Sequence, residues 1–161
     1  MVLKIIYTLF LGLLVALFVG LGIDAFYPGP KAPDYPVMLD TVKQGCQEDA
    51  QTQATRLKFD QDMKDYNDQS KPYNRNVSIA ALSFAILILV ASLTLFSKIK
   101  MMADGILLGG VFTTIYSIIR GLMSEDSRFR FAIVTCGLII ALALGYMKFI
   151  RPKENNQQPE N

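Results

Sequence analysis

The chain contains no histidine and no tryptophan, and only two of its 161 residues are cysteine. Histidine is the commonest general base and metal ligand, so its absence removes the simplest routes to catalysis and to a metal centre. Two cysteines are too few for a disulfide framework or a thiolate metal site. A net charge of +2 without a basic cluster gives no footprint for nucleic acid. We therefore expect no enzyme activity, no cofactor, no metal and no nucleic-acid partner.

Charge is also absent from four long stretches: residues 5–23, 76–97, 105–119 and 131–147. About 20 apolar residues at 1.5 Å each cross the 30 Å hydrocarbon layer of a bilayer. The sequence thus predicts an all-α integral membrane protein with four transmembrane helices. We expect them at 1–23, 77–97, 103–121 and 130–150, with an external region at 24–76 and a disordered cytoplasmic tail at 151–161. The third is short unless Arg120 extends its guanidinium to the headgroups.

The first segment has two interpretations. Lys4 and the pattern Gly20-Leu21-Gly22 resemble a cleavable signal peptide. The apolar run, however, exceeds the usual 7–15 residues of such peptides. Small residues recur every fourth position within it, which favours an uncleaved anchor that packs against other helices.

Basic residues in the short flanks set the expected orientation. With the N-terminus inside, the inner side receives Lys4, Lys98, Lys100, Lys148, Arg151 and Lys153, and the outer side Arg120, Arg128 and Arg130. We therefore expect both termini in the cytoplasm of a bacterial-type plasma membrane, with residues 24–76 outside.

The external region divides into two parts. Residues 24–36 carry four prolines within nine positions, which predicts an extended arm rising roughly 40 Å at about 3.1 Å per residue. Residues 37–70 contain no proline, which predicts a long polar helix descending roughly 50 Å. Because the two lengths are similar, the arm should climb along the helix. Pro72 should then kink or break the helix just above the bilayer.

This helix carries two thin apolar stripes, which are out of phase between Leu57 and Phe59. They contain Leu39, Val42, Cys46, Ala50 and Leu57 in one, and Phe59, Met63, Tyr66 and Tyr73 in the other. The stripes indicate either one helix with two partners or a hairpin that turns near residues 51–56. The absence of Gly and Pro there favours one helix. The second stripe either packs on the arm or docks another protein through Phe59, Met63 and Tyr66.

Small residues recur at every fourth position in three of the four segments. They are Gly12, Ala16 and Gly20, then Gly105, Gly109, Thr113, Ser117 and Gly121, then Gly137, Ala141 and Gly145. Such spacing lets helix backbones approach closely in a membrane. It serves either packing within one four-helix bundle or homo-oligomerisation through residues 103–121. The Thr and Ser hydroxyls should bond to carbonyls of their own helix. Arg120 should pair with Glu125 or Asp126.

These patterns favour a non-enzymatic accessory or scaffold subunit, anchored in the lipid bilayer, whose external helix docks a protein partner. The alternative is a small oligomeric channel or transporter assembled through the small-residue face of the third span. Charge-free spans argue against proton-coupled transport, because buried ionisable groups mark proton pathways. An enzyme would need the external acidic residues, which look like an ordinary solvated face.

Overall fold

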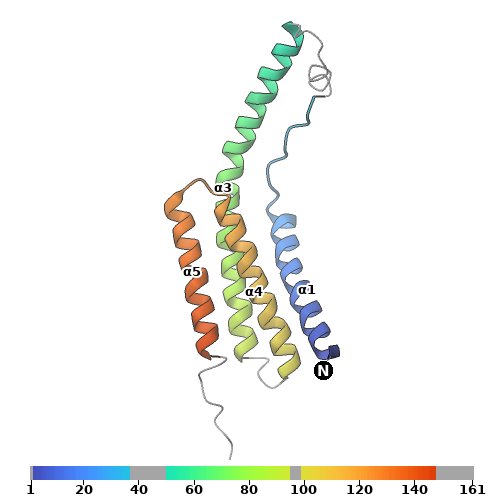
Figure 1. Ribbon diagram of the computed structural model, residues 1–161. Coiled ribbons are helices and arrows are strands. Elements are labelled where there is room, and N and C mark those ends of the chain that lie inside the picture. The colour runs from blue at the N-terminus through green and yellow to red at the C-terminus, as the bar shows by residue number, and fades with distance from the viewer. Residues whose placement is uncertain (1, 37–49, 95–98, 148–161) are drawn as a thin grey trace, which may run out of the picture.

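The computed structural model describes residues 2–36, 50–94 and 99–147, and within these ranges it contains four α-helices and no strand. They are α1 (Val2–Phe26), α3 (Ala50–Thr94), α4 (Lys100–Leu122) and α5 (Ser127–Gly145), shown in Figure 1. All four are long and apolar enough to cross a membrane, as the sequence predicts. The predicted tail at 151–161 lies outside the described residues.

Helix α4 is the centre of the bundle. Helices α1, α3 and α5 all pack against it. Helices α1 and α3 meet over a shorter length, where Val19 and Ile23 form a buried cluster with Val77 and Ala81. Figure 1 shows that successive helices alternate in direction, so the arm and the α4–α5 loop lie at one end of the bundle and the N-terminus lies at the other. Because the outer faces of α1 and α5 are apolar and uncovered, they suit contact with lipid.

Helix α3 is continuous over 45 residues and carries Pro72 inside it. Of the predicted kink or break at Pro72, the break is therefore wrong. Proline removes one backbone hydrogen bond. Its neighbours contact other segments, since Tyr73 stacks on Tyr27 and Lys71 binds Glu125. The helix also runs unbroken through residues 51–56, which excludes the hairpin there. Residues 37–49, the predicted beginning of this helix, lie outside the described part of the chain.

We call residues 50–73 of α3 the mast. They extend the helix about 35 Å beyond the bundle. Residues 27–36, the arm, contain neither helix nor strand and run along the mast (Figure 1). The ring of Tyr27 stacks on Tyr73 with centroids 5.3 Å apart, and Tyr35 meets Phe59 edge-on at 5.4 Å. The two contacts are about 25 Å apart along an extended arm and about 21 Å apart along the helix, so the segments keep register.

Gly29 permits the close approach of the arm to the mast. A Cβ atom at this position would lie 2.9 Å from Cε1 of Tyr73. Any side chain here would push the arm away from the Tyr73 ring. The glycine therefore lets the backbone lie directly against the aromatic surface.

The tightest seam of the fold joins α3 to α4. Ser78 Oγ donates to the carbonyl of Ser117, and Ser117 Oγ donates back to the carbonyl of Ser78, both at 2.7 Å. Both serines are fully buried. At the other end of the seam, Ser92 Oγ donates to the carbonyl of Ala103 at 2.7 Å. Each hydroxyl therefore has a hydrogen-bond acceptor on the neighbouring helix, which the hydrocarbon of a lipid bilayer could not supply.

Sequence reasoning overlooked the α3 side of this seam. The buried residues of α3 are Asn74, Val77, Ser78, Ala81, Ala85, Leu89 and Ser92. They recur at intervals of three and four, which is the signal of a packed helix face. This spacing is present in the sequence, but a pattern of small residues at every fourth position does not include it.

The predicted small residues of α4 pack within this one chain. A Cβ on Gly105 would lie 2.6 Å from Leu11 Cδ2, and one on Gly109 would lie 2.6 Å from Val15 Cβ, both on α1. Gly12 in turn faces Leu108. The expected Thr bonds within α4 also form, since Thr113 and Thr114 donate to the carbonyls of Gly109 and Gly110.

Ser117 does not follow the expected pattern of bonding to its own helix, because its hydroxyl crosses to α3. Gly121 faces Ser78 and Ile133, and Gly137 faces Ile118, which places α5 against α4. By contrast, a Cβ on Gly145 would meet no atom within 4 Å, and Ala141 is exposed. Only the first residue of the predicted α5 triple therefore makes a helix contact.

Candidate functional site

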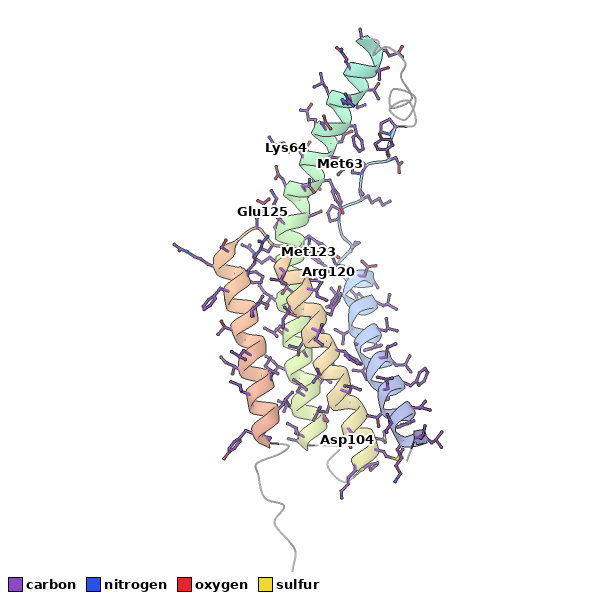
Figure 2. The ribbon with its side chains drawn as sticks, viewed as in Figure 1. Met63, Lys64, Asp104, Arg120, Met123 and Glu125 are labelled. Carbon is purple, nitrogen blue, oxygen red and sulfur yellow. The ribbon has the colours of Figure 1, made fainter. Side chains whose placement is uncertain are left out.

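The arm, the mast and the loop end of α4 surround a hollow of about 1060 Å³, which we call the polar groove. Its charged lining residues are Asp24, Asp60, Lys64, Asp68, Lys71, Arg120, Glu125 and Arg130. Figure 2 shows Met63 and Lys64 on the mast, farther from the bundle than Arg120, Met123 and Glu125. The groove therefore lies where the mast meets the membrane-spanning bundle.

Arg120 lies at the base of the polar groove. Its Nε donates to the Tyr116 hydroxyl at 3.1 Å and its Nη1 donates to Asn74 Oδ1 at 2.9 Å. The guanidinium also lies over the rings of Tyr73 and Tyr116, 5.7 Å and 5.5 Å from their centroids. Stacking on aromatic faces suits the planar, weakly hydrated guanidinium. Asn74, only 8% exposed, was not anticipated from the sequence.

The predicted pairing of Arg120 with the following loop is wrong. Glu125 binds Lys71 Nζ at 2.7 Å instead. Asp126 caps α5, since its Oδ1 accepts from the backbone N–H of Arg128 at 2.9 Å. In the described ranges no carboxylate lies within 4 Å of the Arg120 guanidinium. Glu125 therefore binds α3 and Asp126 caps α5, and neither forms an ion pair with Arg120 of α4.

Lys71 ties the mast to the α4–α5 loop. It binds Glu125 and also Asp68, whose Oδ1 lies 2.9 Å from Lys71 Nζ. The hydrogen bonds to Glu125 and Asp68 raise the pKa of Lys71 above its ordinary 10.5. The hydrogen bond from Lys71 lowers the pKa of Asp68 below its ordinary 3.8.

The two shifts fix the pH window of this bridge. The raised pKa of Lys71 makes its contribution complete below pH 10.5 and lost as the pH rises through the raised value. The lowered pKa of Asp68 makes its contribution complete above pH 3.8 and lost as the pH falls through the lowered value.

We expect Lys71→Met to lower the melting temperature slightly and equally between these two pH limits, because exposed ion pairs contribute little. Melting curves in detergent across pH would check this, and a difference that varies strongly near neutral pH would contradict it.

A second hollow of about 540 Å³, the lipid-facing groove, separates part of α1 from α4. It is lined by Leu13, Ala16, Leu17, Gly20, Leu21, Asp24, Phe112, Tyr116 and Arg120. A Cβ on Gly20 would meet no atom within 4 Å. Ala16 and Gly20, predicted to bring helices into contact, therefore line a space between α1 and α4. The closest approaches of the two helices are at Gly12 and Val15.

The predicted docking residues face the arm. Phe59 packs against Tyr35, while Met63 and Tyr66 are half-buried and line the polar groove. Leu57 points away from them and is 70% exposed. The Phe59 stripe is thus partly covered by the arm, whereas Leu57 is exposed on the other side of the mast.

Over residues 2–36, 50–94 and 99–147, no group of three or more His, Cys, Asp or Glu side chains is arranged to hold a metal ion. No protein-family model matches this chain, and no curated protein or solved structure matches it either. The geometry of the grooves and the mast is therefore the basis for a functional proposal.

Proposed function

We propose that this chain is a non-enzymatic multi-pass membrane protein that acts as an accessory or scaffold subunit, with the mast docking a partner protein outside the membrane. Both termini are then cytoplasmic and residues 24–76 are external in a bacterial-type plasma membrane. The excess of Lys and Arg in the flanks at the N-terminal end of the bundle supports this orientation.

The observation that carries the proposal is the difference between the two faces of the mast. Leu57 and Phe59 lie about 200° apart around the helix axis. The arm covers the side of Phe59, and Leu57 remains 70% exposed as the large apolar side chain on the other side. The Phe59 stripe thus has an internal partner in the arm. Of the other stripe the structure describes Ala50 and Leu57, and both are exposed to an external partner.

The construction of the mast also suits docking. It is continuous with a membrane-spanning helix, and the Tyr27–Tyr73 and Tyr35–Phe59 contacts brace it at two levels. A surface that is already rigid loses little conformational entropy on binding, so more of the contact energy appears as affinity. An unbraced single helix would lose more.

The alternative of a channel assembled through the small-residue face of α4 has less support. Gly105 and Gly109 contact α1, Ser117 contacts α3, and Gly121 contacts both α3 and α5. The face is used inside one chain, so a second copy would have to displace these helices. We therefore do not propose this assembly.

Photo-crosslinking from the two faces of the mast tests the proposal. A benzophenone amino acid at Leu57 should capture a discrete second polypeptide in intact cells, identified by mass spectrometry. The same probe at Phe59 is the matched control, and should crosslink within the chain because it faces the arm. Capture from Phe59 alone, or from neither position, would exclude docking on the Leu57 face.

A further inference from the structure

The polar groove and the lipid-facing groove meet at two residues. Among the residues that the structure describes, only Asp24 and Arg120 line both hollows. One hollow is walled by charged and polar side chains of the external segments, and the other by apolar side chains of α1 and α4. A molecule that extends through both needs a charged end and an apolar chain.

The lipid-facing groove has the depth of one bilayer leaflet. From Leu13 to Asp24 it follows α1 for about 16 Å. This is close to half of the roughly 30 Å hydrocarbon layer. Asp24 ends the charge-free stretch of α1 and Arg120 ends that of α4, so both lie at the depth where headgroups begin.

The two residues at the mouth offer opposite charges. Arg120 has five N–H donors and uses two of them on Tyr116 and Asn74. Neither Arg120 nor Asp24 forms an ion pair within residues 2–36, 50–94 and 99–147. A cation and an anion that stand on opposite walls of one opening match a headgroup that carries both a phosphate and an ammonium.

We propose that the lipid-facing groove binds one phospholipid with a primary ammonium headgroup, of the phosphatidylethanolamine class. One acyl chain lies between α1 and α4, over Gly20. The phosphate binds the remaining guanidinium donors of Arg120, a pairing that the planar fork of Arg favours. The ammonium donates hydrogen bonds to the Asp24 carboxylate, which a trimethylated choline cannot do.

Native mass spectrometry of the full chain tests the groove. The protein is released from mild detergent containing equal amounts of phosphatidylethanolamine, phosphatidylcholine and phosphatidylglycerol with the same acyl chains. Wild type should retain one phosphatidylethanolamine. Gly20→Leu fills the open space and should lower this occupancy about tenfold. Gly22→Leu is the matched control, since a Cβ on Gly22 also meets no atom within 4 Å but Gly22 does not line the groove.

Asp24→Asn tests the headgroup assignment. Because Asp24 is exposed, the substitution leaves the packing of the bundle in place. Losing one charge-assisted contact should reduce the preference for phosphatidylethanolamine over phosphatidylglycerol about tenfold. Three results would each overturn the proposal: equal retention of the three lipids by wild type, equal occupancy in Gly20→Leu and Gly22→Leu, or an unchanged lipid order in Asp24→Asn.

Discussion

Gly109→Leu is expected to separate α1 from α4 and to lower the free energy of unfolding by about 2–3 kcal/mol. Even the first atom of the new side chain would lie 2.6 Å from Cβ of Val15 and 3.2 Å from the carbonyl oxygen of Gly12. These atoms belong to the backbone of α1 or sit directly on it, so the clash cannot be relieved by rotating a side chain. The whole helix must move.

The measurement is the fraction of monodisperse protein left on size-exclusion chromatography after stepwise heating in detergent. A loss of this size should lower the apparent melting temperature by about 5–10 °C. Gly145→Leu is the control, because a Cβ on Gly145 meets nothing within 4 Å. If both variants melt like wild type, the close approach of α1 to α4 is wrong.

Ser78→Leu should cost about as much as Gly109→Leu, for a different reason. Ser78 is fully buried, its hydroxyl binds the Ser117 carbonyl, and its Oγ lies 2.8 Å from where a Cβ of Gly121 would be. Leucine is too large for this tightly packed interface and removes a hydrogen bond. We therefore expect the free energy of unfolding to fall by about 2–4 kcal/mol.

Ser83→Leu provides the matched comparison on the same helix. Ser83 is exposed, and its hydroxyl bonds only to the carbonyl of Ile79 in its own helix. In a membrane that position faces lipid, where leucine is favourable, so the variant should be neutral or slightly more stable. The same heating assay should show a lower melting temperature for Ser78→Leu alone. Equal effects at both sites would mean that the Ser78–Ser117 seam does not hold α3 to α4.

The four spans could be predicted from the sequence because the bilayer sets both their length and their lack of charge. The absence of a hairpin near residues 51–56 could be predicted as well, since that segment has no residue that favours a turn. The continuity of the helix through Pro72 could not be predicted from the sequence. A proline disfavours a helix interior, and whether the helix continues depends on contacts with distant segments, here those of Lys71 and Tyr73, which the local sequence does not reveal.

The candidate site was harder to predict because its residues come from α1, the arm, α3, α4, the α4–α5 loop and α5. Spacing within one helix identified Gly109 and Ser117, but could not tell that Gly20 lines a hollow. That depends on how far apart α1 and α4 lie at each level. The sequence predicted that Arg120 pairs with the nearest acidic residues. In the fold, Glu125 binds Lys71 instead, and Arg120 contacts Asn74 and two tyrosines.

The central position of α4 has a consequence for biosynthesis. Helix α1 makes most of its contacts with α4, which leaves the ribosome after α3, and fewer with α3. During synthesis, α1 therefore waits in the membrane without its main helix partner. Until α4 is inserted, the contacts that can hold α1 beside α3 are the cluster of Val19, Ile23, Val77 and Ala81 and the stacked Tyr27 and Tyr73 rings.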